Sequence, residues 1–118
     1  MQPSLHDAAF LWDMLQAAIA VRDFARDRTL QDYTADLMLR SAVERQIEII
    51  GEAARKVSDS FQQQHPEIPW RGIVGQRHVL AHEYGEIDHQ RIWKVATDHI
   101  PQLIECLEPL IPQPPSSI

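Results

Sequence analysis

A chain of 118 residues is long enough to bury a single core, and it needs neither disulfides nor a metal to do so. Its formal net charge of -6 lacks the basic footprint of most nucleic-acid binders, so any RNA or DNA role must rest on a local cluster of Arg and His. No apolar run approaches the ~20 residues of a membrane span, and the N-terminus has no basic region followed by an apolar one, so we expect a cytoplasmic protein.

The first predicted element is a long amphipathic helix from about residue 5 to residue 27. Its apolar positions recur at intervals of three and four. Ser4, with Asp7 three residues later, is a candidate N-cap. The break at residues 28–32 offers Thr29 or Asp32 as the cap of the next helix, and so short a connection predicts antiparallel neighbours. The apolar face is predicted to comprise Ala8, Leu11, Trp12, Leu15, Ile19 and the aliphatic stem of Arg22.

A second helix is predicted from about residue 33 to residue 61, where the helical pattern is the longest in the chain. Its apolar residues are spaced by three or four throughout. They are Leu39, Val43, Ile47, Ile50, Ala54, Val57 and Phe61. Glutamates alternate with arginines and lysines between these positions, which indicates a solvated face with some support from oppositely charged pairs four residues apart.

Two more helices are predicted beyond residues 65–69, a loop whose two prolines cannot continue a helix. Helical character resumes from residue 70 to Tyr84. It resumes again after Asp88, which is a good N-cap for the last helix. Pro101 falls inside that last helix and should kink or break it.

Together these patterns predict an all-α, antiparallel bundle of four to five helices. We expect a single domain over residues 1–111, followed by a flexible Pro-rich tail over residues 112–118. Cys106 is the only cysteine, which excludes an intrachain disulfide. Its position among leucines indicates a small buried apolar residue rather than a functional thiol.

Four groups that carry charge or exchange protons lie within the eight residues from Arg77 to Tyr84, the others being His78 and His82. In a helix, Arg77 and Tyr84 share a face because seven residues make nearly two turns. Arg77 and His82 are five apart, which turns them by ~140°, so they are neighbours only obliquely. Gly85 suits the left-handed position that ends many helices, so the group should be displayed near a surface.

The chain resembles the HepT-like ribonucleases of the HEPN superfamily, the toxins of HepT/MntA toxin–antitoxin systems. The resemblance covers nearly the whole chain and centres on the family's Arg-x4-His-x-Tyr motif, matched by Arg77, His82 and Tyr84. Family-like phrases flank it at residues 43–53 and 69–75. A bare Arg-x4-His is common by chance, so the flanks carry much of the likeness.

The resemblance implies a homodimeric helical bundle in which two motifs face a shared cleft. It implies cleavage of cellular RNA, with transfer RNA favoured over messenger RNA, catalysed by Arg77 and His82 without a cofactor. It also implies an antitoxin partner, an MntA-like minimal nucleotidyltransferase that adds AMP to Tyr84. The family often has Asn after the motif arginine, where this chain has His78, so His78 is assigned a supporting role that leaves open which histidine carries the proton.

The residue types suit the reaction that the resemblance implies, because cutting RNA without a metal needs a base near the 2′-hydroxyl and a positive charge near the developing phosphorane. A histidine with an ordinary pKa near ~6.5 exchanges protons at neutral pH, and this role is assigned to His82. Arg77 offers a planar fork of donors to phosphate oxygens. The attacking 2′-hydroxyl belongs to the substrate, which favours RNA over DNA.

Several alternatives compete with this interpretation. His78 and His82 are four apart and could be two metal ligands on one helix face, although a third ligand would have to come from elsewhere. Arg77 and Glu83 could instead form a surface pair, with His82 merely favoured as a cation at a helix end. A further possibility is a dimeric helical adaptor that only holds a nucleotidyltransferase.

The remaining histidines and the tryptophans are assigned no chemistry. Trp12, Trp70 and Trp93 are expected to be packing anchors, since aromatic residues at helical spacing usually serve the core. The histidines expected to be isolated surface or boundary residues are His6, His65, His89 and His99.

Overall fold

The computed structural model describes residues 3–82 and 88–112, with the side chains of all of these except residues 77–82. Every regular element in these ranges is a helix, which confirms the all-α prediction. The elements are α1 (Leu5–Ala25), α2 (Leu30–Ala35), α3 (Leu37–Lys56), α4 (Asp59–Gln64), α5 (Trp70–His82), α6 (His89–Lys94), the π-helix η2 (Val95–His99), α7 (Ile100–Leu107) and the 3₁₀-helix η3 (Glu108–Leu110).

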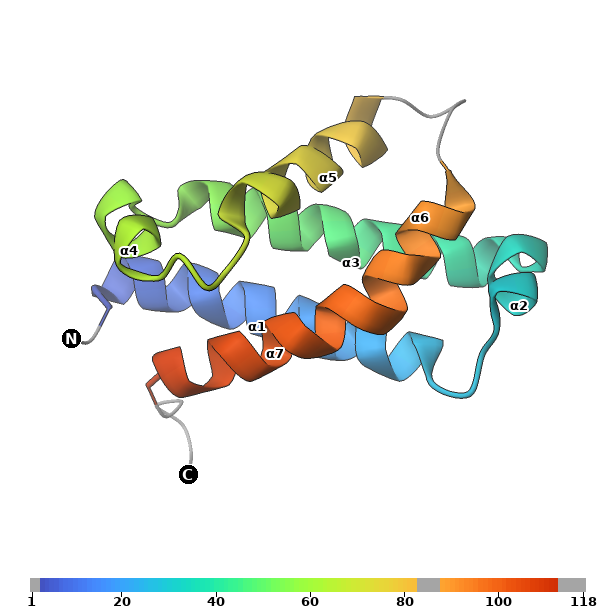
Figure 1. Ribbon diagram of the computed structural model, residues 1–118, viewed down its shortest axis with the longest axis horizontal. Coiled ribbons are helices and arrows are strands. Elements are labelled where there is room, and N and C mark those ends of the chain that lie inside the picture. The colour runs from blue at the N-terminus through green and yellow to red at the C-terminus, as the bar shows by residue number, and fades with distance from the viewer. Residues whose placement is uncertain (1–2, 83–87, 113–118) are drawn as a thin grey trace.

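The long helices α1 and α3 form the centre of the bundle and run antiparallel to each other (Figure 1). α5 packs on α3, and α7 packs on α1. The short helices α2 and α4 lie at opposite ends of the molecule, where the chain enters and leaves α3 (Figure 1). The antiparallel neighbours predicted from the short connection at residues 28–32 are therefore present, with α2 inserted between them.

The predicted second helix is wrong as one element, because residues 33–61 are divided among the end of α2, α3 and the start of α4. Asp36 separates α2 from α3, and it caps α3 by accepting a hydrogen bond from the backbone N–H of Leu39. Ser58 caps α4 in the same way through the N–H of Phe61. The apolar stripe nevertheless remains in phase across the second break, between α3 and α4, and all seven of its predicted members are buried.

The second break is held in place by Asp7, a buried carboxylate of α1. Its Oδ1 accepts the backbone N–H of Ser58 at 2.8 Å and its Oδ2 accepts the Ser58 hydroxyl at 2.6 Å. The backbone N–H of Asp7 in turn donates to Ser4, which confirms Ser4 as the N-cap of α1. Thr29 and Asp32 likewise form a capping box at the start of α2.

The core face of α1 differs from the predicted one by about one position. Leu11 and Leu15 are buried as expected, but Trp12 is 38% exposed and is not a packing anchor. The other buried apolar residues of α1 are Met14, Ala17, Ala18 and Val21. α1 has apolar residues around most of its circumference, so the spacing alone does not select a single face. Trp70 and Trp93 are buried, as predicted.

Pro101 lies at the start of α7, directly after the five-residue π-helix η2. Proline cannot donate the backbone hydrogen bond that a continuing α-helix requires, and the winding changes from π-helical to α-helical at this place. Asp88 caps the preceding helix α6, as predicted, because its Oδ1 accepts the N–H groups of Gln90 and Arg91. Helix α6, η2 and α7 thus follow one another without an intervening loop (Figure 1).

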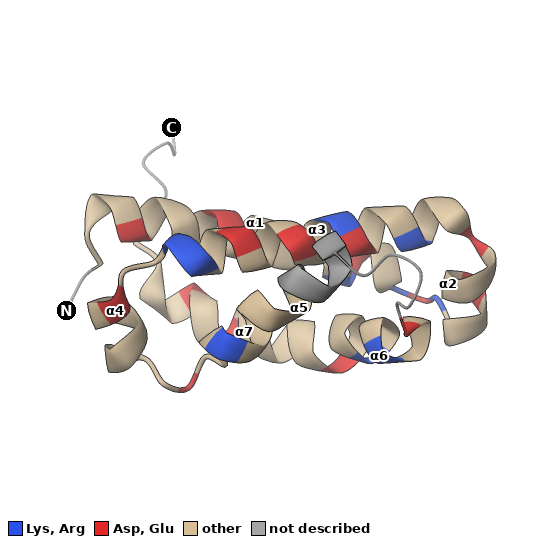
Figure 2. Cartoon of the chain, turned by 90° about the horizontal axis from the view of Figure 1, so that it is seen from above, with Lys and Arg blue, Asp and Glu red and all other residues tan. Residues whose placement is uncertain are grey.

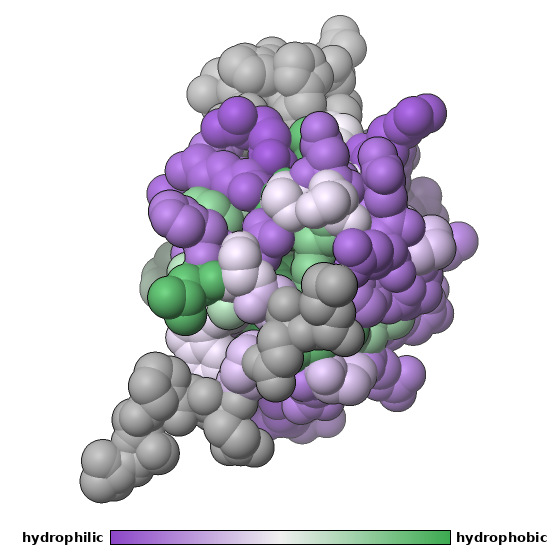
Figure 3. Space-filling view, turned by 90° about the vertical axis from the view of Figure 1, so that its left-hand side faces the viewer, coloured by the Kyte–Doolittle hydropathy of each residue, from purple (hydrophilic) through white to green (hydrophobic). Residues whose placement is uncertain are grey.

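The surface at the end of the molecule near α4 is mainly hydrophilic, with small hydrophobic areas between the polar side chains (Figure 3). Among the described helices, none has the length and the apolar character that crossing a membrane demands.

Candidate active site

The predicted site residues lie at the C-terminal end of α5. The backbone of Arg77, His78 and His82 belongs to this helix, in its last two turns. Their side chains lie outside the described part of the structure, as does all of Tyr84. The helix therefore gives these three residues their predicted spacing, and the interactions of their side chains remain predictions.

The opposite end of α5 is firmly anchored. Trp70, its first residue, is buried, and its indole N–H donates to the backbone carbonyl of His65 at 2.9 Å. The Trp70 ring also meets Phe61 edge to face, with ring centroids 6.4 Å apart. His65 is not isolated as predicted, since its ring lies 4.5 Å from that of Phe61 and its Nδ1 lies 3.0 Å from a Glu67 oxygen.

Beyond this anchor, α5 is supported mainly from one side. It packs on α3, and it diverges from the rest of the bundle toward its C-terminal end (Figure 1). Gly72 and Gly75 are exposed, and a Cβ atom added to either would meet nothing within 4 Å. The part of α5 that leads to the motif therefore presents an open surface.

A groove of about 590 Å³ separates α5 from the continuous segment formed by α6, η2 and α7. Its apolar lining includes Ile47 and Ile50 of α3, Ile73 of α5, and Leu103 of α7. We call it the α5–α7 groove. Its volume is within the range of small-ligand sites, which are typically apolar with a few polar groups. Cys106 lines the same groove and is half-buried, so it is less enclosed than predicted.

Polar and charged groups border this groove. Gln76 of α5 is buried, and its side-chain Nε2 has no hydrogen-bond partner in the described part of the chain. Arg91 and Lys94 of α6 and His99 of η2 also line the groove. None of them is assigned to a site from the sequence alone, because α5 and α6 face each other across the groove only in the folded chain.

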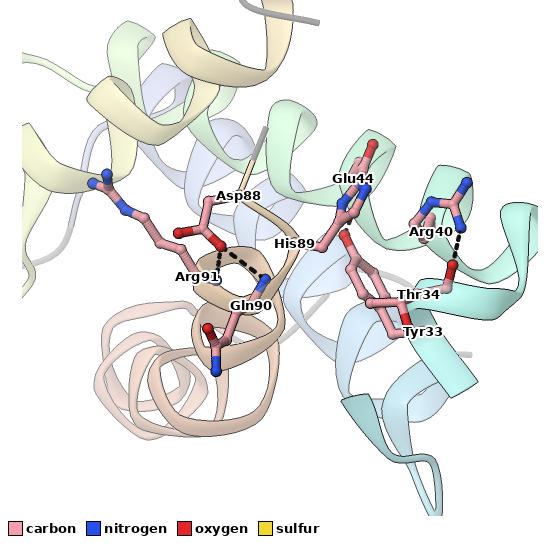
Figure 4. A network of polar contacts seen from close by, with 8 residues as sticks. All are labelled: Tyr33, Thr34, Arg40, Glu44, Asp88, His89, Gln90 and Arg91. Atoms are coloured by element: carbon pink, nitrogen blue, oxygen red, sulfur yellow. Dashed lines mark hydrogen bonds and ion pairs between the residues drawn. The ribbon is translucent and has the colours of Figure 1, made fainter. Parts of the chain in front are cut away.

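A second polar cluster joins α2, α3 and α6 (Figure 4). The fully buried Tyr33 donates its hydroxyl proton to Glu44 Oε2 at 2.8 Å, and His89 Nδ1 lies 3.8 Å from the same oxygen. The rings of Tyr33 and His89 are arranged edge to face, and Trp93 packs on Tyr33. His89 is thus a partner in a contact between elements and not the isolated residue predicted from sequence.

This cluster leads to a prediction about alkaline pH. Burial, followed by the hydrogen bond to Glu44, raises the pKa of the Tyr33 phenol far above its ordinary value. The unfolded chain releases this proton near pH ~10, whereas the folded chain retains it. The contribution of Tyr33 to the free energy of unfolding is therefore complete below pH ~10 and is lost as the pH rises above that value. In a Tyr84→Phe variant, which has Tyr33 as its sole tyrosine, tyrosinate absorbance should appear only together with loss of the helical circular dichroism signal.

Tyr33→Phe is the control, because it removes the titrating phenol and should reduce the loss of stability above pH ~10. Ionisation of Tyr33 near pH ~10 in a fully folded protein would contradict the prediction.

Comparison with known proteins assigns most of the helical region to one family. The family model described as "Ribonuclease HepT-like" matches residues 14–110. "Putative RNase MJ1380" of Methanocaldococcus jannaschii is 38% identical over 95 residues, which cover 80% of this chain and 87% of that protein. "Probable ribonuclease HepT" of Thermococcus cleftensis is 36% identical over 94 residues, covering 80% and 86% of the two chains. No solved structure matches the chain.

Proposed function

Because the chain belongs to the HepT-like ribonuclease family, we propose that it is the toxin of a HepT/MntA-type toxin–antitoxin system that cuts cellular RNA without a metal. The observation that carries the proposal is the Arg-x4-His-x-Tyr motif at Arg77, His82 and Tyr84, in a chain whose family model spans the motif. Transfer RNA is the favoured substrate, and messenger RNA is the alternative. The proposed location of the activity is the cytoplasm.

The proposed reaction needs three groups. The substrate's 2′-hydroxyl attacks the adjacent phosphorus and displaces the 5′-oxygen of the next nucleotide, with His82 exchanging the proton. Arg77 stabilises the negative charge that builds up on the phosphorane oxygens. His78 supports this pair from the same helix. No metal or other cofactor takes part.

The proposed partner is an MntA-like minimal nucleotidyltransferase that modifies Tyr84. Transfer of AMP to the phenol oxygen would add bulk and negative charge next to the cation that binds RNA phosphate. RNA would then be both repelled and blocked. Such a modification requires an accessible tyrosine, and the other tyrosine of the chain, Tyr33, is fully buried.

We also propose that two chains pair so that their motifs face a shared cleft. Pairing would double the number of Arg77 and His82 side chains near the RNA, which offsets the acidic net charge of -6. The one-sided packing of α5 on α3 supports this, since the open surface at Gly72 and Gly75 leaves room for a second chain to approach. A helical glycine costs about 1 kcal/mol relative to alanine, so close approach of a partner gives these two a physical role.

The test is cleavage of RNA by the purified chain in the presence of excess EDTA. We expect 5′-labelled transfer RNA and messenger RNA to be cut, with fragments that end in a 2′,3′-cyclic phosphate or its hydrolysis product, because the 2′-hydroxyl is the nucleophile. Substrate in which every 2′-hydroxyl is methylated should remain intact. Cleavage that EDTA abolishes and added Mg²⁺ or Zn²⁺ restores would contradict the metal-free mechanism.

A further inference from the structure

Arg91 and Lys94, which we call the α6 cationic pair, differ from most basic residues of the helices α1 and α3. Basic and acidic residues are mixed along α1 and α3 (Figure 2), and carboxylates form ion pairs with most of the cations there. The ion-paired cations are Arg22 and Arg26 with Asp23, Arg45 with Glu48, and Arg55 and Lys56 with Glu52. Within the described residues, no carboxylate lies within ion-pair distance of either member of the α6 cationic pair, and both are exposed.

The side chain of Arg91 points toward the α5–α7 groove. Its side chain extends away from the cluster of Glu44 and His89, on the other side of α6 (Figure 4). It lines the α5–α7 groove together with Lys94 and His99. Glu67 is the one described carboxylate on the lining, and its Oε2 is already in contact with His65 Nδ1 at 3.0 Å. The charge along this side of the groove is therefore positive in a chain whose net charge is -6.

Gln76 provides a second, independent indication of a ligand. It is 8% exposed and lines the groove from the α5 side, and its Nε2 donors have no partner among the side chains and backbone that the structure describes. A buried amide without a partner is costly, so most such groups bond to protein, water or a ligand. An acceptor-rich molecule in the groove would satisfy it. Gln76 also directly precedes the motif residue Arg77 in α5.

We propose that the α5–α7 groove holds the single-stranded stretch of RNA next to the phosphodiester that is cut. The α6 cationic pair contacts successive phosphates, and Gln76 donates to an oxygen of the same strand. Bases of that stretch cover the apolar lining, which suits recognition of unpaired RNA. The inference rests on the proposed ribonuclease function and adds the residues that guide the substrate to the motif.

The test measures binding of a short, fluorescein-labelled, 2′-O-methylated single-stranded RNA, which keeps its phosphates but lacks the nucleophile. Arg91→Ala/Lys94→Ala should raise the Kd about tenfold or more, as expected for two lost charged hydrogen bonds. The slope of log Kd against log salt should fall by about 1.4, since each phosphate contact on a single strand contributes about 0.7. The matched control is Arg45→Ala/Lys56→Ala, which removes the same two residue types from α3.

Gln76→Leu gives a separate readout. Because its Nε2 has no partner within residues 3–76 and 88–112, the substitution should leave the melting temperature unchanged or raise it. RNA binding should still weaken by about two- to tenfold. A structural role for Gln76 would instead lower the melting temperature and leave the affinity of the folded protein unchanged.

Equal losses of affinity in the two double variants, or no loss in either, would overturn the groove proposal. A change in particle mass by light scattering in Arg91→Ala/Lys94→Ala would also overturn it, because the pair would then serve contact between subunits. The proposed function fails independently if the wild-type chain leaves unmodified RNA intact. Cleavage by the wild type with normal binding by Arg91→Ala/Lys94→Ala would reject the groove alone.

Discussion

Arg77→Ala and His82→Ala are each expected to reduce RNA cleavage by about 10²-fold or more without unfolding the protein. Loss of the guanidinium removes the charge that stabilises the phosphorane, and loss of the imidazole removes the group that exchanges the proton. The measurement is the single-turnover rate on labelled RNA, with circular dichroism to verify the helical fold. Both residues lie in the last two turns of α5, far from its anchor at Trp70, so truncation there should leave the core intact.

Matched controls are available in the same chain. Arg71 is an exposed arginine on the same helix, and His6 is an exposed histidine of α1. Arg71→Ala and His6→Ala should retain cleavage within about a factor of two, as surface substitutions usually have small effects. His78→Ala distinguishes a supporting role from a catalytic one, since a supporting residue should cause the smaller loss. Full activity in both Arg77→Ala and His82→Ala would reject the catalytic assignment and favour a non-catalytic adaptor.

Tyr84→Phe is expected to abolish modification by the antitoxin partner. Coexpression of the wild-type chain with an MntA-like nucleotidyltransferase should increase its intact mass in AMP-sized steps, and the modified protein should no longer cut RNA. The phenol oxygen would bond to the α-phosphorus of ATP, with pyrophosphate leaving and the phenol proton passing to solvent. The added negative charge opposes RNA phosphate, which is why modification and inactivation should appear together.

The second tyrosine makes this experiment selective. Tyr33 is fully buried and its hydroxyl donates to Glu44, so Tyr33→Phe should be modified as fully as the wild type. Mass steps that persist in Tyr84→Phe would show that a different residue is the acceptor. Absence of any mass step in the wild type, with a catalytically active partner present, would contradict the proposed toxin–antitoxin pairing.

Much of the fold could be predicted because its determinants are local. The caps at Ser4, Thr29 and Asp88 depend on residues two or three positions away, and the stripe of α3 depends on spacing alone. The break before α4 could not be predicted in this way. It is fixed by Asp7, which contacts Ser58 across 51 positions of sequence. The exposure of Trp12 could not be predicted either, because α1 is apolar on more than one face.

In the candidate site, too, the residues that are close in sequence could be predicted and those brought together by folding could not. The motif from Arg77 to Tyr84 could be found because its members are close in sequence and resemble a family pattern. Gln76, Arg91 and Lys94 could not, because the groove they share exists only when α5 and α6 face each other across α3. A glutamine beside the motif and two cations on a polar helix have no distinguishing spacing of their own.

The π-helix η2 determines which residues of α6 and α7 can act together. A π turn holds one residue more than an α turn, so the residues after it are shifted in register by one position, or about 100°, from where uninterrupted α-helical winding would put them. With this shift, Arg91 and Lys94 before the turn and Leu103 and Cys106 after it all line one groove. Deleting one residue from η2 should restore regular α-helical winding and leave the cations of α6 and the apolar residues of α7 on the same side of the segment. Relatives with a one-residue gap here should then keep the same bundle and the same groove.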